Sequence, residues 1–247
     1  MIKFNPELIE TYLLSILNGS RSGRWANFLR AILRFLSWIF YTLVELRIWL
    51  YKYRILQGST LGCQVISVGN LTVGGTGKTP VVEVFARNLH KQGRKVAILS
   101  RGYKSRSIPF WEKTWQRITN KTIEVLPRVV SDGKNLLLDS YTAGDEPYML
   151  ASNLPDVAVI VDKDRVKAGK YAIKNLGCDT LILDDGFQYL KLENRIEIAL
   201  VDRTNPFGGG FLLPRGLLRE PIKNIKRAQF IFITKCDEQG DINLKNK

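Results

Sequence analysis

Residues 64–79 read QVISVGNLTVGGTGKT, and this segment carries the clearest structural signal in the sequence. Its first part, Gln64–Val68, is a short apolar run that predicts a buried strand. The glycine-rich part ends in Lys78 and Thr79, which begin a helical pattern that continues to about Lys91. A strand, a glycine-rich loop and a helix in this order predict a P-loop, the loop that binds the phosphates of a nucleotide.

Six consecutive residues are expected to contact the nucleotide: Gly74, Gly75, Thr76, Gly77, Lys78 and Thr79. Glycines let backbone N–H groups converge on phosphate oxygens because no Cβ stands in the way, and the helix N-terminus adds partial positive charge. We expect Lys78 to reach the β- and γ-phosphates and the Thr79 hydroxyl to bind Mg²⁺. The loop departs from the usual pattern at Thr72, where a glycine is common. The predicted chemistry is the binding of a nucleoside triphosphate with Mg²⁺.

Short apolar runs after the loop predict five further strands, which alternate with helical patterns. They are Lys95–Leu99, Val157–Val161, Thr180–Leu183, Ile196–Val201 and Phe230–Thr234, with a helix over about Arg165–Asn175. Nearly continuous apolar strands separated by helices are typical of a parallel sheet. The predicted fold class is therefore α/β, a P-loop NTPase-like domain with a mostly parallel sheet covered by helices on both faces. Residues 104–142 interrupt the alternation and predict a β-rich excursion or a loop.

Two aspartates, Asp184 and Asp185, follow the apolar strand that ends at Leu183, as in a Walker B element. The carboxyl ends of parallel strands open to the same edge of a sheet, so these carboxylates are expected to face Lys78 and Thr79. One of them would hold Mg²⁺ directly or through water. The alternative interpretation is a strand end followed by an Asp-Gly turn.

Phosphoryl transfer also needs a group that positions the nucleophile and a cation that balances charge on the γ-phosphoryl group. Asp145 and Glu146 are candidates for the first task, although a glycine before them and a proline after them also suggest a simple helix start. Arg101 and Arg165 are candidates for the second task. Arginines are common on the surface of so basic a chain, so spacing alone does not choose between these interpretations.

The composition restricts the chemistry of the 247-residue chain. Three cysteines without a CxxC pair argue against a disulfide framework or a zinc site, and a single histidine, His90, nearly excludes a Ser-His-Asp triad. The formal net charge of +14, from 37 Lys+Arg and 23 Asp+Glu, suits a phosphorylated substrate, an anionic membrane surface or nucleic acid. Nucleic acid is the weakest of these, because many basic residues accompany large aliphatic ones rather than lining a polar groove.

Residues 1–57 are expected to form N-terminal amphipathic helices, separate from a P-loop domain over residues 58–247. Between Phe28 and Leu56 the few polar residues follow one narrow helical stripe, and the other faces are apolar and aromatic. The uncharged run Phe35–Val44 is too short to cross a bilayer, which needs about 20 residues. The pattern favours a helix that lies in the plane of an anionic membrane surface; the alternative is a helix packed on the α/β core. A shorter amphipathic segment, Pro6–Leu17, precedes it.

Five motifs then occur in one order: SVGNLTVGGTGKTP (67–80), LSRGYKSR (99–106), AGDEPYMLA (143–151), LILDDGFQ (181–188) and LLPRGLLREP (212–221). Together they resemble the tetraacyldisaccharide 4′-kinases of lipid A biosynthesis, over about residues 65–234. The resemblance extends to Thr72, which is usual in that family. Two features differ: Tyr189 stands where the family usually has histidine after DDGFQ, and the family's C-terminal lobe is expected to be absent from this chain.

The resemblance implies a P-loop kinase domain over residues 58–247 that transfers the γ-phosphate of ATP to the 4′-hydroxyl of a lipid disaccharide. It implies a peripheral or monotopic protein on the cytoplasmic face of the bacterial inner membrane. Lys78 and Thr79 match the family's phosphate and Mg²⁺ positions, and Asp184 and Asp185 match its acidic pair. Asp145 matches its proposed general base, and Arg165 matches a phosphate-contacting arginine.

Two other functions stay open. Thr234–Asp237 (TKCD) resembles the guanine-reading element of a P-loop GTPase switch, although a polar strand exit explains it equally simply. The chain could also be a membrane-bound, catalytically impaired remnant that binds nucleotide. The sequence makes no prediction about the oligomeric state.

Overall fold

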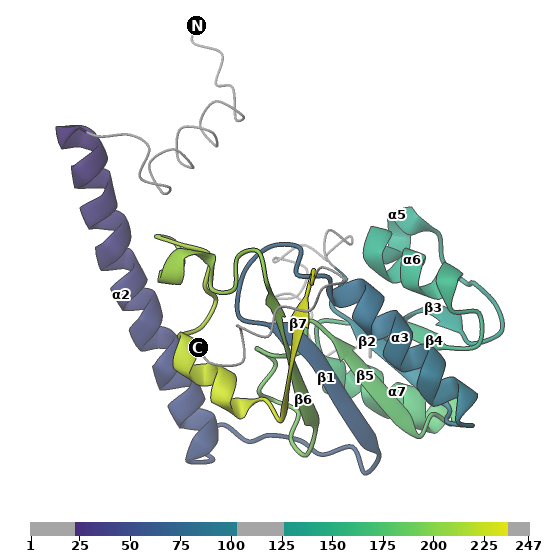
Figure 1. Cartoon of the computed structure of the whole chain (residues 1–247). Helices are drawn as coiled ribbons and strands as arrows, with labels where there is room; N and C mark the ends of the chain where they lie inside the picture. The colour runs from purple at the N-terminus through teal and green to yellow at the C-terminus, as the bar shows by residue number, and fades with distance from the viewer. Residues whose placement is uncertain (1–22, 103–125, 237–247) are drawn as a thin grey trace, which may run out of the picture.

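The structure, a computed structural model, describes residues 23–102 and 126–236. Its centre is a seven-stranded sheet in the order β3-β4-β2-β5-β1-β6-β7 (Figure 1). All neighbouring strands are parallel except β3, which is antiparallel to β4. The strands are β1 (Gln64–Asn70), β2 (Val96–Ser100), β3 (Arg128–Asp132), β4 (Ala158–Val161), β5 (Thr180–Asp184), β6 (Ile196–Asp202) and β7 (Phe230–Thr234). The predicted α/β class with a mostly parallel sheet is confirmed.

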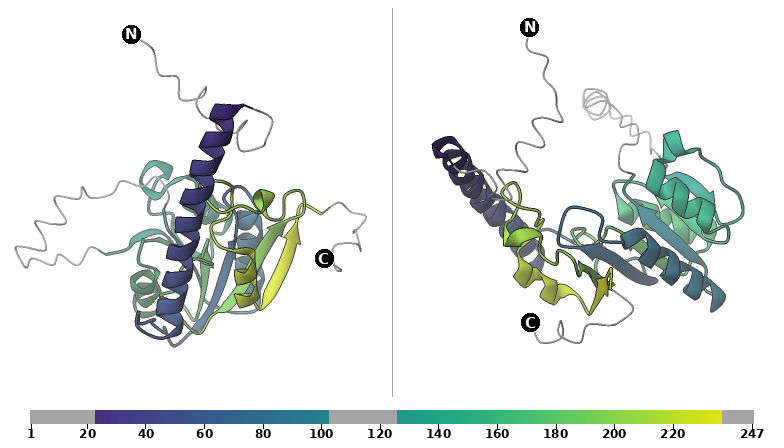
Figure 2. Two further views of the ribbon diagram at one scale, coloured as in Figure 1. Left: turned by 90° about the vertical axis from the view of Figure 1, so that its left-hand side faces the viewer. Right: turned by 45° about the horizontal axis from the view of Figure 1, so that its top comes forward.

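Helices cover both faces of the sheet because successive side chains of a strand point to opposite sides. On β1, Ile66 and Val68 pack in one core with α3 (Lys78–Lys91) and α6 (Asp145–Asn153). Val65 belongs to the other core, which includes the buried face of α7 (Arg165–Leu176). Figure 2 shows these helices on the two sides of the sheet. This arrangement explains the nearly continuous apolar strands in the sequence.

Part of the predicted excursion between residues 104 and 142 is visible in the structure. It contributes the edge strand β3 and the short helix α5 (Ser140–Ala143), which lies next to α6. Residues 103–125 lie outside the described residues, as do the predicted helix Pro6–Leu17 and the end of the TKCD element at Asp237. The β-rich interpretation is therefore confirmed for the last part of the excursion only.

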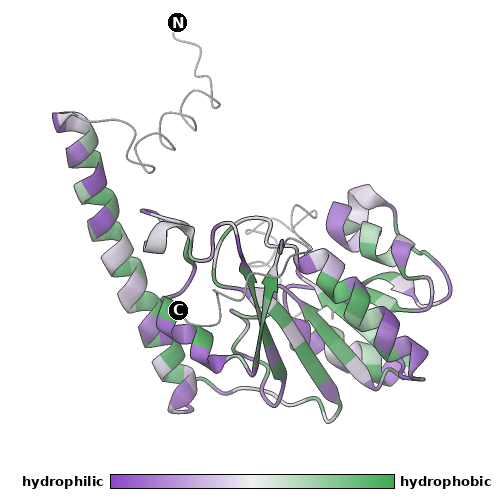
Figure 3. Ribbon diagram, in the orientation of Figure 1, coloured by the Kyte–Doolittle hydropathy of each residue, from purple (hydrophilic) through white to green (hydrophobic). Residues whose placement is uncertain are grey.

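The N-terminal helix α2 (Arg24–Lys52) runs along one side of the α/β body (Figures 1 and 2). It begins and ends four residues earlier than the pattern from Phe28 to Leu56 suggests. Only Ala26 and Ser37 of this 29-residue helix are buried, whereas many of its large apolar side chains are exposed. Figure 3 shows that hydrophobic residues recur along the helix. None of the helices in the described part of the chain is both long and apolar enough to cross a membrane.

The side of α2 that contacts the body carries polar groups at helical spacing. The Ser37 hydroxyl donates to the carbonyl of Leu212 at 2.8 Å and accepts from the backbone N–H of Arg215 at 3.0 Å. One and two turns further on, Tyr41 and Glu45 contact the 3₁₀ helix η2 (Ile222–Arg227). Hydrogen bonds and an ion pair thus attach this side of the helix to the body, whereas Trp38, Leu43, Leu46 and Trp49 are exposed.

Candidate functional site

The loop between β1 and α3 has the backbone of a phosphate-binding loop. Gly74 and Gly77 have φ values of 123° and 74°, a region in which a side chain would be strained. A Cβ added at Gly74 or Gly75 would meet no protein atom within 4 Å, so the space beside these glycines is open. Among the described residues no side chain caps the N-terminus of α3, which leaves its first N–H groups without a side-chain acceptor there.

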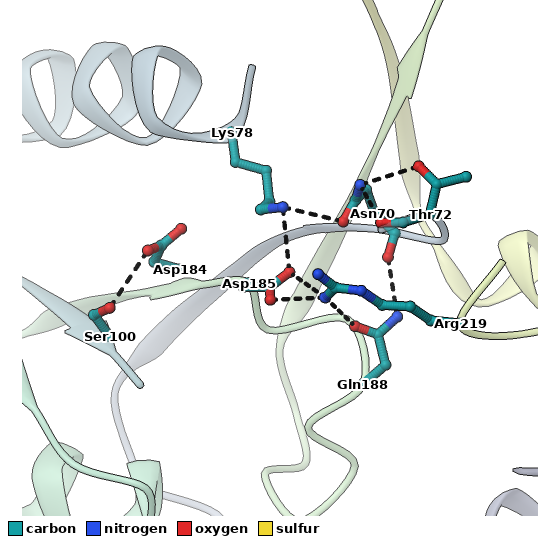
Figure 4. Close-up of polar contacts among 8 residues, drawn as sticks. All are labelled: Asn70, Thr72, Lys78, Ser100, Asp184, Asp185, Gln188 and Arg219. Atoms are coloured by element: carbon teal, nitrogen blue, oxygen red, sulfur yellow. Dashed lines mark hydrogen bonds and ion pairs between the residues drawn. The ribbon is translucent and has the colours of Figure 1, made fainter. Parts of the chain in front are cut away.

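Lys78 lies at the first position of α3 and points back across the loop (Figure 4). Its Nζ donates to Asn70 Oδ1 at 3.3 Å and lies 3.5 Å from Asp185 Oδ1. Asn70 is held in turn by Thr72, because Asn70 Nδ2 donates to the Thr72 carbonyl at 2.8 Å and to its hydroxyl at 3.3 Å. Thr72, at the position where P-loops commonly have glycine, thus helps to orient the amide that contacts Lys78.

Asp185 also contacts Arg219, a residue that the sequence analysis did not predict as part of the site. Arg219 Nη1 lies 2.9 Å and 2.7 Å from the two carboxylate oxygens of Asp185. Burial acts to raise the pKa of Asp185, but the charges of Lys78 and Arg219 outweigh it and hold the pKa below its ordinary value. Gln188 completes the set: its Nε2 donates to the Asn70 carbonyl at 2.9 Å, and its Oε1 lies 3.4 Å from Arg219 Nη1.

Asp184 has a different environment, although it is the adjacent residue. Its side chain is buried, and its hydrogen bond with the Ser100 hydroxyl is long, at 3.5 Å. Burial and the charges of Asp185 and Glu146 raise the pKa of Asp184 to about 6, against the opposing charges of Lys78 and Arg165. The predicted acidic pair is therefore one ion-paired carboxylate and one desolvated carboxylate that forms no ion pair with the described residues.

Arg165, the first residue of α7, is only 5% exposed. Its guanidinium carbon lies 5.0 Å from the centre of the Tyr189 ring. Burial and the charge of Arg101 lower its pKa, while Tyr189, Asp185 and Asp184 act in the opposite direction. The structure thus brings Arg165 into the electrostatic environment of the acidic pair and places Arg101 near Arg165.

Tyr189 also supports the helix end that carries Arg165. Its hydroxyl donates to Asp164 Oδ1 at 3.0 Å. The same carboxylate caps α7 by accepting from the backbone N–H groups of Val166 and Lys167. The tyrosine at the family's usual histidine position therefore combines a cation–π contact with a hydrogen bond.

Asp145 is exposed at the first position of α6, after Gly144 with a φ of 93°. The predicted helix start at this motif is confirmed. Glu146 affects the pKa of Asp184, so this end of α6 lies at the same edge of the sheet as the acidic pair. Within the described part of the chain, Asp145 shares no hydrogen bond with the Lys78–Asp185–Arg219 network. Its role as a base stays a prediction.

The Thr234-Lys235 pair ties β7 to neighbouring elements. The Thr234 hydroxyl donates to the carbonyl of Thr76, in the glycine loop, at 2.8 Å. Lys235 forms an ion pair with Asp202 at the end of β6 and lowers the pKa of that carboxyl. These contacts give both residues a structural task, which favours the polar strand exit over a guanine-reading element.

Sequence reasoning missed Arg219, Asn70, Gln188 and Ser100. Each lies in one of the five ordered motifs, which is the signal that could have found them. Arg219 belongs to LLPRGLLREP, and it reaches the site because its backbone N–H donates to the Leu71 carbonyl at 2.7 Å, just before the glycine loop.

The chain is similar to known proteins in sequence and in fold. The family model for tetraacyldisaccharide-1-P 4′-kinase matches residues 29–247. Tetraacyldisaccharide 4′-kinases from Pelobacter propionicus and Halothermothrix orenii are each 39% identical to the chain over 228 residues, which is 92% of it. The match covers 59% and 55% of those two proteins, so the chain spans little more than half of their length. The crystal structure of LpxK from Aquifex aeolicus in complex with ATP has a TM-score of 0.71 and 38% identity, and the match covers 84% of this chain and 59% of that one.

Proposed function

The chain belongs to the tetraacyldisaccharide-1-P 4′-kinase family, and we propose that it transfers the γ-phosphate of ATP to the 4′-hydroxyl of a tetraacyldisaccharide 1-phosphate. The observation that carries this proposal is the Lys78–Asp185–Arg219 network beside the open glycine loop. In this proposal, the two cations of the network would face the phosphates of a nucleotide that is bound at the loop. The similar LpxK structure contains ATP, which supports ATP as the nucleotide.

The residues of the loop fit a triphosphate. The glycine backbone and the uncapped start of α3 offer N–H groups, and Lys78 offers a positive charge. The Thr76 hydroxyl is buried and has no hydrogen-bond partner among the described residues, an unsatisfied group inside the loop itself. We assign Gly74, Gly75, Thr76, Gly77, Lys78 and Thr79 to phosphate binding.

The donors near the loop also fit Mg²⁺, a hard cation that prefers oxygen ligands. Thr79, at the second position of α3, offers a hydroxyl, and Asp184 and Asp185 offer carboxylates at the same sheet edge. Asp184 is the better candidate because its carboxylate forms no ion pair in the part of the chain that the structure describes, whereas Asp185 already pairs with Lys78 and Arg219. When bound, Mg²⁺ would neutralise part of the negative charge of the phosphates.

The remaining predicted residues have roles in the transfer step. Asp145, exposed at the start of α6, would accept the proton of the acceptor hydroxyl. Arg165, buried beside the acidic pair, would balance charge that develops on the γ-phosphoryl group. Lys78 would hold the β- and γ-phosphates during transfer.

The assay is transfer of labelled γ-phosphate from ATP to a tetraacyldisaccharide 1-phosphate in detergent micelles, with GTP as the competing nucleotide. We expect a product labelled at the 4′ position, and unlabelled ATP should compete much more strongly than GTP. A clear preference for GTP would support the alternative of a P-loop NTPase switch. Normal ATP binding without transfer would support a catalytically impaired nucleotide-binding remnant.

We further propose that residues 1–57 form a membrane-surface segment, separate from the P-loop kinase domain of residues 58–247, on the cytoplasmic face of the inner membrane. Trp38, Leu43, Leu46 and Trp49 of α2 are between 47% and 63% exposed, on the side away from the Ser37 and Glu45 contacts. Such a face is unfavourable in water and favourable at the acyl boundary of a bilayer. The acylated acceptor would be reached from the same surface.

Changing Trp38, Leu43 and Trp49 together to serine is expected to weaken binding to phosphatidylglycerol vesicles by at least about tenfold, because each side chain would bury apolar area in the membrane. ATP affinity should not change, since these side chains point away from the body. Vesicle co-sedimentation and calorimetric ATP titration measure the two quantities. The control is Val84→Ser, which alters an apolar side chain of α3 that is 58% exposed. Equal loss of vesicle and ATP binding would mean that α2 is part of the core.

A further inference from the structure

One contact of α2 continues into the α/β body: Glu45 binds Asn224, which in turn binds the buried Glu220. We propose that Glu45 on α2 is a positioning residue for the phosphate site, and that it acts through Asn224 and Glu220 on the segment that carries Arg219. This inference rests on the proposed function, because it assumes that Arg219 serves the phosphate site. It gives α2 a second role beside its membrane contact, the positioning of Arg219 in the kinase domain.

Glu45 is the single acidic residue of α2, a helix rich in basic, aromatic and aliphatic residues. Its Oε1 accepts a hydrogen bond from Asn224 Nδ2 at 3.2 Å. Its Oε2 lies 2.6 Å from Lys223 Nζ, which also donates to the Tyr41 hydroxyl at 3.0 Å. The Lys223 pair is exposed and contributes little, whereas Asn224 is buried. The contact that leads inward is therefore the one to Asn224.

Asn224 connects two carboxylates that come from distant parts of the chain. Its Nδ2 group donates to Glu45 Oε1 and to Glu220 Oε2, each at 3.2 Å. A side-chain amide has two N–H donors, so both are used in this bridge. Loss of either acceptor leaves a buried donor unsatisfied, which costs free energy and allows the amide to rotate.

Glu220 is 3% exposed, and burial raises its pKa, so its position depends on its partners. Arg227 Nη2 lies 3.1 Å from Glu220 Oε1 and also donates to the Phe187 carbonyl at 3.1 Å. Phe187 is fully buried and follows Asp185 and Gly186 in the chain. Glu220 is thus held by two residues of η2, and one of them, Arg227, also contacts the segment that follows the acidic pair.

Arg219 is the residue immediately before Glu220, and its guanidinium contacts Asp185. The backbone N–H of Arg219 donates a hydrogen bond to the Leu71 carbonyl. Because Glu220 is the next residue in the chain, we expect a displacement of Glu220 to move Arg219 as well. A continuous series of contacts therefore joins α2 to the phosphate site: Glu45, Asn224, Glu220, Arg219 and Asp185. A chain of hydrogen bonds and ion pairs of this kind can couple a change at one site to the binding affinity of another.

The test compares Glu45→Ala with Glu45→Gln, with Arg219→Ala and with the control Lys223→Met. The measured quantities are the affinity for Mg-ATP, by calorimetry, and the KM and kcat of phosphoryl transfer. We expect Glu45→Ala to lower ATP affinity about fivefold, with a matching rise in the KM for ATP. Glu45→Gln should restore wild-type affinity because its amide oxygen still accepts from Asn224. Lys223→Met should not change ATP affinity, since it removes only the exposed contacts with Glu45 and Tyr41. Thermal unfolding should shift more in Glu45→Ala than in Lys223→Met, because only the first leaves the buried Asn224 donor unsatisfied.

The double variant Glu45→Ala/Arg219→Ala tests whether Glu45 affects ATP binding through Arg219. If Glu45 acts through Arg219, the double variant should bind ATP no more weakly than Arg219→Ala alone. Additive losses, or a Glu45→Ala protein that binds ATP like the wild type, would overturn the inference and leave the proposed function intact. An Arg219→Ala protein with wild-type ATP affinity would overturn both, because Arg219 would then have no part in the phosphate site.

Discussion

Replacing Lys78 with alanine is expected to reduce ATP affinity about 100-fold, because charge-assisted hydrogen bonds to two phosphates contribute about 3 kcal/mol. The side chain already points across the glycine loop, with its Nζ 3.3 Å from Asn70 and 3.5 Å from Asp185. Little reorganisation is needed before it contacts a phosphate. Titration calorimetry with ATP and Mg²⁺ measures the loss directly.

The control for this experiment is Lys91→Ala, which removes an exposed lysine from the last turn of the same helix. It changes the net charge by the same amount and should leave ATP affinity within about twofold. If Lys78→Ala and Lys91→Ala gave the same small loss, the loop would not be the nucleotide site. Lys78→Arg should recover only part of the affinity, because a guanidinium does not reproduce the compact ammonium group.

The second large effect is on the stability of the metal-free protein: removing the charge of Asp184 and removing the charge of Asp185 are expected to change it in opposite directions. Asp184→Asn is expected to increase the free energy of unfolding at pH 7, by about 1–3 kcal/mol. The reason is that burial raises the pKa of Asp184 to about 6, so the charged form is disfavoured in the folded protein. Asp185→Asn should decrease stability, because the pKa of Asp185 is held low by its pairs with Lys78 and Arg219.

The pH dependence follows from the same shift. Between the ordinary value of 3.8 and about 6, the folded protein binds more protons at Asp184 than the unfolded chain does. The contribution of Asp184 to stability is therefore complete below pH 3.8 and is lost as the pH rises through about 6. The Asp184→Asn protein should lack this component of the pH profile.

Urea unfolding of the metal-free wild type, Asp184→Asn and Asp185→Asn proteins between pH 4 and pH 8 tests both signs. Mg²⁺-dependent ATP binding should be strongly reduced in Asp184→Asn even though that protein is more stable, a trade-off that is common at functional sites. The same direction of stability change in both variants would contradict the assignment of one paired and one desolvated carboxylate.

Several features of the fold and site were predictable because their signals are contiguous in the sequence. The β1 strand, the glycine loop and α3 occupy one uninterrupted stretch, and the two aspartates follow directly on β5. Parallel strand topology then places their carboxyl ends at one edge without further information. The helical spacing of polar residues on α2 was equally local, and it correctly indicated a helix with an apolar side.

The antiparallel direction of β3 and the contacts of Arg219 had no such local signal. β3 lies after a long interruption of the strand and helix pattern, and its pairing depends on β4, which follows it. Arg219 is 34 residues from Asp185 in the chain. A basic chain offers many arginines, and sequence spacing does not show which of them folds back onto a given carboxylate.

The sequence by itself determined the α/β class, the phosphate loop, the acidic strand end and the amphipathic character of α2, because periodicity and contiguous motifs encode them. Only the tertiary structure decided which aspartate is paired, which arginine pairs with it, and which side of α2 contacts the body. Glu45 and Asn224 are 179 residues apart, and Ser37 and Leu212 are 175 apart. Such contacts depend on how the whole chain packs, since the side chains involved have no relation to one another along the sequence.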